Sequence, residues 1–233
     1  PSMYGARVPS DVQVREMHPE DLGQVRAVYA EGVAGRGATF ETEGDGEPIV
    51  VGFHHWGADV VNHLRGMFGI VIWDTHTKTM FAARDQFGIK PLYYATTDAG
   101  TVFASEMKCI LEMADEIGLE LNLDRRAIEH YVDLQYVPEP ESLHANIRRV
   151  ESGCTVTLRP GEEVVSERYF KPRFPVQQVK QGEEQQLFNR IAEALEDSVA
   201  KHMRADVTVG SFLSGGIDST AIATLAKRHN PDL

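Results

Sequence analysis

The sequence predicts a protein of the α+β class, with strands and helices concentrated in different parts of the chain. Short apolar runs separated by turn residues over 69–83 predict a β-hairpin. Apolar residues recur every four positions over 187–199, which predicts an amphipathic helix. A strand over 207–212, a glycine turn and a helix over 217–229 would form the first β-α unit of a separate α/β layer.

Length and composition exclude several classes of protein. The chain has 233 residues, enough for one or two domains, and 42% of its residues are hydrophobic. A net charge of −12 argues against a nucleic-acid partner, because no basic stripe is present to neutralise phosphates. No apolar run is long enough to cross a bilayer, so we expect no membrane partner. The two cysteines, Cys109 and Cys154, indicate no disulfide framework and predict a cytoplasmic protein.

The first 39 residues differ in pattern from the rest. Pro19 and the acids after it predict the beginning of a helix, on which Leu22, Val25, Val28 and Tyr29 would share one face. Residues 12–43 resemble the first β-α unit of GNAT-type acetyltransferases. The glycine-rich acetyl-CoA loop of those enzymes does not follow. The resemblance therefore implies a foreign head over residues 1–39 without its cofactor site.

The middle of the chain alternates strands, turns and one helix. Asp124 to Leu134 is predicted to be helical, with Ile128, Tyr131 and Val132 directed inward. Other predicted elements are strands at 101–104, 150–158 and 163–169, and a proline- and glutamine-rich linker at 171–182.

Arg84 and Asp85 follow a predicted strand directly. They form either an acid–base pair or a structural ion pair at the strand end.

The segment Leu213-Ser214-Gly215-Gly216-Ile217-Asp218-Ser219-Thr220 carries the clearest chemistry. A strand, a small-residue turn and a helix start bring backbone N–H groups and the positive dipole end together, which favours a phosphate. Glycine lets the backbone approach an oxyanion closely, serine supplies hydroxyl donors, and the aspartate can hold a divalent cation. The GxxxxGK[ST] spacing of a Walker A loop is absent. An ordinary glycine turn is the alternative.

The order of motifs resembles glutamine-hydrolysing asparagine synthetase over residues 40–233. The motifs are GDGE, LRGMF, RDQFGIKPLYY, SEMK, QYVPEPESLHANIRRVESG and FLSGGIDST. The resemblance implies a partial Ntn-type αββα sandwich over residues 40–170, the linker at 171–182, and the first β-α unit of a truncated, Rossmann-like ATP-pyrophosphatase domain over residues 183–233. It also implies glutamine, aspartate and ATP as substrates, Mg²⁺ as a cofactor, and it allows a homo-oligomer.

The same resemblance assigns site residues. Asp45 would bind the α-ammonium group of glutamine, and Asp218 would help hold Mg²⁺. The residues assigned to ATP are Leu213, Ser214, Gly215, Gly216, Asp218 and Ser219. No catalytic residue is assigned, because the family's nucleophile is an N-terminal cysteine and Pro1 stands first here.

These observations lead to an expectation and to two alternatives. A chimeric or truncated synthetase chain without that cysteine is expected not to release ammonia from glutamine, and to attract pyrophosphate without useful affinity for ATP. The first alternative is a non-catalytic remnant that associates with a full-length synthetase. The second is an acetyltransferase.

Overall fold

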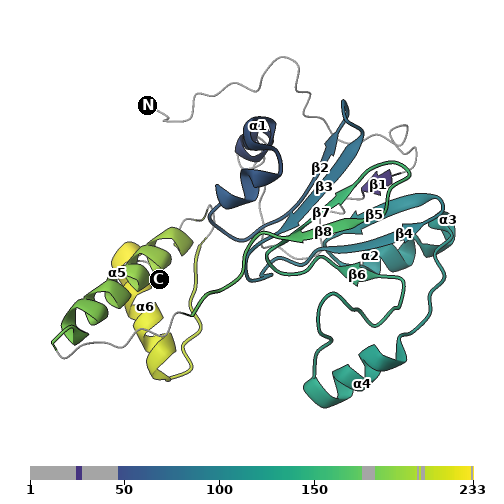
Figure 1. Ribbon diagram of the computed structural model, residues 1–233. Helices are drawn as coiled ribbons and strands as arrows, with labels where there is room; N and C mark the ends of the chain where they lie inside the picture. The colour runs from purple at the N-terminus through teal and green to yellow at the C-terminus, as the bar shows by residue number, and fades with distance from the viewer. Residues whose placement is uncertain (1–24, 28–46, 175–181, 204, 206–207, 232) are drawn as a thin grey trace. The chain divides into compact units, whose positions relative to one another are not determined.

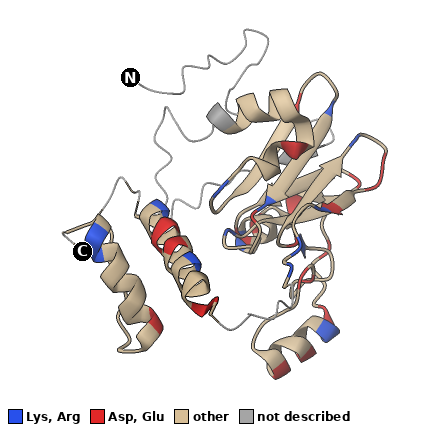
Figure 2. Cartoon of the chain, turned by 60° about the vertical axis from the view of Figure 1, so that its left-hand side comes forward, with Lys and Arg blue, Asp and Glu red and all other residues tan. Residues whose placement is uncertain are grey.

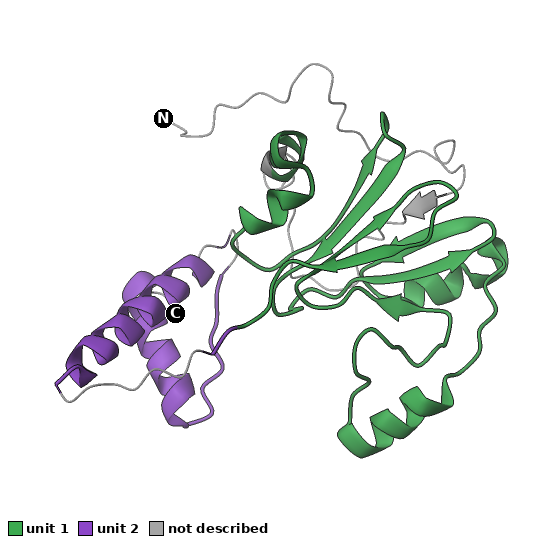
Figure 3. Ribbon diagram, in the orientation of Figure 1, with its two compact units in different colours: residues 1–172 green, residues 173–233 purple. Residues whose placement is uncertain are grey.

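The computed structural model describes residues 25–27, 47–174, 182–203, 205, 208–231 and 233. The chain divides into two compact units, residues 1–172 and residues 173–233 (Figure 3). Each unit is described by itself below.

One sheet of the first unit is antiparallel throughout, with the strand order β2-β3-β7-β8 (Figure 1). Its strands are β2 (Gly69–Asp74), β3 (Thr79–Arg84), β7 (Cys154–Leu158) and β8 (Val165–Arg168). The predicted hairpin over 69–83 is confirmed. Its turn is fixed locally, because Asp74 Oδ1 accepts hydrogen bonds from the backbone N–H groups of His76 (2.8 Å) and Thr77 (3.2 Å).

The second sheet has the order β1-β5-β4-β6 and contains one parallel pair. Its strands are β1 (Val25–Ala27), β5 (Gly100–Ala104), β4 (Tyr93–Thr97) and β6 (Arg148–Arg149). The helix predicted to begin at Pro19 is wrong at 25–27, where the backbone pairs with residues 101–103 of β5. The helical spacing of four apolar residues predicts only a local preference. Here the free edge of β5 pairs with the backbone of these residues, and this pairing decides their conformation.

Alternating side chains divide the first unit into four layers. Met80 and Ala82 of β3 pack with Phe103 of β5, so these two faces of the sheets meet. Phe81 and Ala83 point to the other face of β3 and pack against the 3₁₀ helix η2 (Gly57–Asn62), with α1 (Glu47–Trp56) beside it. On the outer side of β5, α2 (Met107–Glu112) and α3 (Ala114–Ile117) supply the covering residues. The order is therefore helix, sheet, sheet, helix.

The helix α4 (Arg125–Leu134) lies apart from these layers. Its predicted bounds are confirmed, and Asp124 caps it by accepting hydrogen bonds from the N–H groups of Arg126 and Ala127. The prediction that its apolar residues face inward is wrong: Ile128, Tyr131 and Val132 are 40%, 54% and 72% exposed. Helical spacing shows that these residues share a face, but it does not show what covers that face.

The described residues of the second unit form two helices, α5 (Glu184–His202) and α6 (Ile217–His229). Glu196 of α5 joins them by binding Arg228 at 3.2 Å and His229 at 2.7 Å. The helix predicted over 217–229 is confirmed. The strand predicted over 207–212 is not, since residues 208–212 form no strand. The described part of this unit offers no neighbouring strand to pair with it, and an unpaired strand lacks its ladder of hydrogen bonds.

The distribution of charge on α6 suits its dipole. Asp218 lies in the first turn, and Lys227, Arg228 and His229 lie in the last turn (Figure 2).

Taken as a whole, the described residues combine helices with mainly antiparallel sheets, so the predicted α+β class is confirmed. No helix among them is both long and apolar enough to cross a membrane.

Candidate functional site at the beginning of α6

The glycine loop before α6 has the local geometry that its sequence predicts. Gly215 has a φ of 81°, a left-handed conformation that side-chain-bearing residues rarely adopt. Gly216, the N-cap residue, has a φ of −77° and a ψ of 160°, which any residue can adopt. A methyl group added to Gly216 would meet only the Ser214 and Ser219 hydroxyls at 3.6 and 3.9 Å. The backbone conformation therefore favours glycine at 215, whereas at 216 it does not.

The predicted ATP-binding residues lie together on this loop. Leu213 to Asp218 are exposed, and Ser219 is half-buried in the first turn of α6. The hydroxyl oxygens of Ser214 and Ser219 lie 3.0 Å apart and share a hydrogen bond across the loop. Because the first N–H groups of a helix have no acceptor within that helix, the loop can present donors to an anion.

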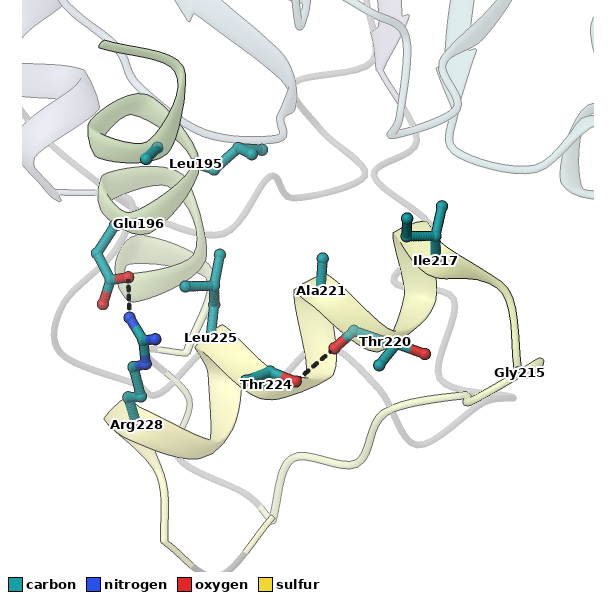
Figure 4. A pocket seen from close by; sticks show the side chains of 10 residues that line it. Leu195, Glu196, Gly215, Ile217, Thr220, Ala221, Thr224, Leu225 and Arg228 are labelled. Atoms are coloured by element: carbon teal, nitrogen blue, oxygen red, sulfur yellow. Dashed lines mark hydrogen bonds and ion pairs between the residues drawn. The ribbon is translucent and has the colours of Figure 1, made fainter. Parts of the chain in front are cut away.

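The groove beside the loop is less suited to a phosphate. A space of about 700 Å³ lies between α5 and α6 (Figure 4). Ile217, Ala221 and Leu225 line it from α6, and Leu195 lines it from α5. Glu196 and Arg228 are the charged residues in its lining, and they bind each other. An apolar wall with neutralised charges cannot replace the hydration of a phosphate, so the anion would bind at the loop.

The second candidate, Arg84 and Asp85, is a structural network. Arg84 pairs with Glu139 at 2.5 Å, and it donates further hydrogen bonds to the carbonyl groups of Gly88, Lys90 and Val150. Asp85 is 1% exposed. Its carboxylate accepts hydrogen bonds from the backbone N–H groups of Phe68, Phe87, Ile89 and Lys90, at 2.9 to 3.3 Å. Groups bonded in this way fix a turn, so Arg84 and Asp85 act as a structural network rather than as an acid–base pair.

Glu139 was missed by the sequence analysis. It also accepts hydrogen bonds from the N–H and the hydroxyl of Ser152, at 2.8 and 2.9 Å. Burial by itself raises the pKa of Glu139, but the hydrogen bonds from Ser152 and the Arg84 guanidinium outweigh it, and the pKa lies below its ordinary value. No local signal could have identified this partner, because 55 residues separate it from Arg84.

The remaining predicted site residue and the two cysteines lie away from this loop in the sequence. Asp45 is outside the described residues. Cys154 is buried in the first unit, and burial raises the pKa of its thiol, which makes it a poor nucleophile. Cys109 packs against the core beneath α2. Among the described positions, no group of three His, Cys, Asp or Glu residues is arranged to hold a metal ion.

Comparison with known families decides the membership of the chain. A family model described as a glutamine amidotransferase domain matches residues 24–170, which is more than half of the chain. The chain belongs to the glutamine amidotransferase family. A second model, described as asparagine synthase, matches residues 190–233, which include the loop and α6. The amidotransferase match begins at residue 24, so it includes residues 24–39 of the predicted head.

Individual relatives confirm the predicted resemblance to glutamine-hydrolysing asparagine synthetases. A Mycobacterium bovis protein, provisionally named as one, is 56% identical over 198 residues, which cover 84% of the amidotransferase chain and 30% of the relative. Asparagine synthetase (glutamine-hydrolysing) 1 of Bacillus subtilis is 42% identical over 199 residues, which cover 85% of this chain and 30% of the relative. A similarly named protein of Methanocaldococcus jannaschii is 31% identical over 188 residues, which cover 78% of this chain and 35% of the relative. The chain thus spans about a third of the length of these relatives.

Proposed function

We propose that the chain takes part in the ATP-dependent amidation of aspartate to asparagine with nitrogen from glutamine. The observation that carries this proposal is the glycine loop at the beginning of α6, with Gly215 at a φ of 81° and an open approach to Gly216. The loop lies within the segment that matches asparagine synthase, and it follows an amidotransferase domain along the same chain. That order fits a protein in which one domain hydrolyses glutamine and the following domain activates a carboxylate.

Different segments of the sequence would form the domains that carry the two activities. Residues 40–170 form the amidotransferase domain of the Ntn type, which the order of helix, sheet, sheet and helix supports. Residues 171–182 form the linker, and residues 183–233 form the first part of an ATP-pyrophosphatase domain. The head at 1–39 retains its GNAT-like assignment as a proposal. Asp45 would bind the α-ammonium group of glutamine, as an unpaired carboxylate does.

In the synthetase half, the aspartate side-chain carboxylate attacks the α-phosphate of ATP, and pyrophosphate leaves. Ammonia from glutamine then attacks the carbonyl carbon of the β-aspartyl-AMP. The bond between that carbon and the adenylate oxygen breaks, AMP leaves with the electron pair, and the nitrogen loses a proton to give the amide. The role of the loop is to hold the pyrophosphate. Backbone N–H groups at Ser214 to Ile217 would bind its oxygens, and the nearby hydroxyls would donate to the same group.

Asp218 is the residue that would hold Mg²⁺. Among the described residues it has no hydrogen-bond or ion-pair partner, and it lies exposed in the first turn of α6. One carboxylate is a poor site for the free ion, but Mg²⁺ in nucleotide sites takes one or two carboxylates together with phosphate oxygens and water. The single carboxylate therefore fits Mg-ATP. When bound, the ion would neutralise charge on the phosphates.

The experiment titrates the 233-residue chain with Mg-ATP while backbone amide signals are followed by NMR. We expect saturable shifts at residues 214–217 with a dissociation constant in the millimolar range, because a helix end contributes only about 0.3–1 kcal/mol when exposed. Millimolar binding corresponds to about 4 kcal/mol, so several N–H groups and the cation must act together. Gly216→Ala should weaken binding at least about fivefold, since its methyl group blocks the close approach.

The matched control is Gly210→Ala. Gly210 also has open space around it, and it lies upstream of the loop. We expect this variant to bind Mg-ATP as the unaltered chain does. Asp218→Asn should weaken binding only when Mg²⁺ is present. A Gly216→Ala chain that binds normally, or an unaltered chain without saturable shifts at 214–217, would count against the proposal and in favour of a non-catalytic remnant.

A further inference from the structure

One carbonyl group at the beginning of α6 attracts an unusual number of donors. Gly216 O accepts hydrogen bonds from Thr220 N at 3.1 Å, from Thr220 Oγ1 at 2.8 Å and from Ser219 Oγ at 3.1 Å. The first is the ordinary helical bond between residues four apart. The two hydroxyl bonds are additional. Because a carbonyl oxygen has two lone pairs, the three donors compete, and one of them can leave without exposing an unpaired acceptor.

The direction of this carbonyl sets the direction of the neighbouring N–H. The peptide between Gly216 and Ile217 is planar and trans, so its C=O and its N–H point in opposite directions. Donors from Thr220 and Ser219 hold the carbonyl toward the body of the helix. The N–H of Ile217 must therefore point out of the helix start, where an anion would bind. Fixing Gly216 O thus fixes a donor for the pyrophosphate.

The hydroxyl of Ser219 has two possible tasks but only one proton. When it donates to Gly216 O, the proton shared with Ser214 must come from Ser214, and neither hydroxyl then has a proton left for a ligand. To donate to a phosphate, Ser219 has to release Gly216 O. The hydroxyl of Thr220 can remain on that carbonyl at the same time, because Ser214 shares its hydrogen bond with Ser219 and not with Thr220.

We propose that Thr220 is a positioning residue, which holds the Gly216 carbonyl while Ser219 turns its hydroxyl to the pyrophosphate. The inference rests on the proposed function of the loop. Thr220 contacts no ligand in this arrangement; it acts through Gly216 and Ile217. Its side chain lies on the first turn of α6, as Figure 4 shows.

The chain contains a matched control one turn further along. Thr224 Oγ1 donates to Thr220 O at 2.7 Å, which is the same kind of bond on the same helix (Figure 4). The test compares Thr220→Val, Thr220→Ser and Thr224→Val in the full 233-residue chain. Valine keeps the shape of threonine and removes the hydroxyl, whereas serine keeps the hydroxyl. Any general effect of a β-branched apolar residue on the helix should be equal at both positions.

The first measurement needs no ligand. NMR relaxation should show lower backbone order at residues 215–217 in Thr220→Val than in the unaltered chain, in Thr224→Val or in Thr220→Ser. The second measurement is the Mg-ATP titration, in which Thr220→Val should weaken binding about fivefold, the change expected for one hydrogen bond. Thr220→Ser should restore it, and Thr224→Val should leave it unchanged.

A double-mutant cycle tests the exchange of Ser219 directly. Ser219→Ala should weaken binding about fivefold in the unaltered chain. In a Thr220→Val background it should weaken binding less than about twofold, because Ser219 is then retained on Gly216 O. Additive losses would overturn the proposal, as would a Thr220→Val chain whose loop order and binding match those of Thr224→Val. If the unaltered chain binds no Mg-ATP, the proposed function fails, and the loop-order measurement alone supports or overturns the role of Thr220.

Discussion

Two turns in this chain carry the same kinds of residue and use them in opposite ways. The turn after β3, residues 84–90, contains Asp85 and Gly88, and the loop before α6 contains Asp218 and Gly215. Asp85 is buried and accepts four backbone N–H groups. Asp218 is exposed and has no such partner among the described residues. Gly88 and Gly215 both have positive φ, at 64° and 81°.

The surroundings of the two glycines differ in the same way. A methyl group at Gly88 would lie 2.3 Å from Ser152 Oγ and 2.9 Å from the Arg84 guanidinium, whereas one at Gly215 would meet nothing within 4 Å. In the turn after β3 the polar groups are buried and bonded to one another. In the loop before α6 they are exposed to solvent. An aspartate beside a glycine in the sequence is therefore compatible with either a structural clamp or a ligand site, and the partners decide between them.

Gly88→Ala should show the largest effect on stability. Alanine disfavours the positive φ at this position, and its methyl group would clash with the buried guanidinium. We therefore expect a loss of about 3 kcal/mol or more in the free energy of unfolding. Gly118→Ala is the control, since Gly118 has a φ of 66° with nothing within 4 Å. That variant should lose only about 1 kcal/mol. Denaturant unfolding of both variants measures the difference, and equal losses would remove the contrast between closed and open turns.

Glu139→Gln should show the next largest effect, and only above acidic pH. Because the pKa of Glu139 is lower in the folded chain, its contribution to stability is complete above its ordinary value of 4.5 and disappears as the pH falls through the folded value. We expect the variant to lose about 2 kcal/mol at pH 7, the size of a hydrogen bond to a charged group, and to match the unaltered chain at low pH.

The control for this prediction is Glu162→Gln. Glu162 also pairs with an arginine, Arg159, at 3.4 Å, but both side chains are more than half exposed. An exposed pair of this kind contributes less than about 1 kcal/mol, so the variant should unfold nearly as the unaltered chain does at every pH. Urea unfolding between pH 3 and pH 8 checks both variants. A pH-independent loss in Glu139→Gln would show that its charge is not what holds the turn.

The smallest expected effect compares the two glycines of the loop. Gly215→Ala should lose about 1 kcal/mol, because alanine resists the left-handed conformation. Gly216→Ala should change the free energy of unfolding by less than about 0.5 kcal/mol, because neither its dihedral angles nor its neighbours resist a methyl group. Thermal unfolding of the two variants gives the comparison. A large loss in Gly216→Ala would mean that this glycine serves the fold, which would weaken its assignment to the ligand.

Elements fixed by their own residues were predictable from the sequence. The hairpin over 69–83 follows from the alternation of its strands and from Asp74 in the turn, and α6 follows from Gly216 and from the charges at its two ends. α4 likewise has the bounds that its apolar spacing predicts, with Asp124 at its beginning. The glycine loop belongs to the same group, because φ at Gly215 and the bonds around Gly216 involve residues within five positions of each other. Local sequence determines such features, since their partners lie close by along the chain.

Features that depend on distant partners were decided by the tertiary structure alone. Arg84 could be recognised as a charged residue at a strand end, but its pairing with Glu139 required the chain to return 55 residues later. Val25 to Ala27 became a strand because β5 offered a free edge, and the apolar face of α4 remained exposed because none of the described elements of its unit covers it. Residues 208–212 formed no strand for the same reason. A pattern of side chains specifies a face or an edge, whereas the element that meets it is chosen by the packing of the whole unit.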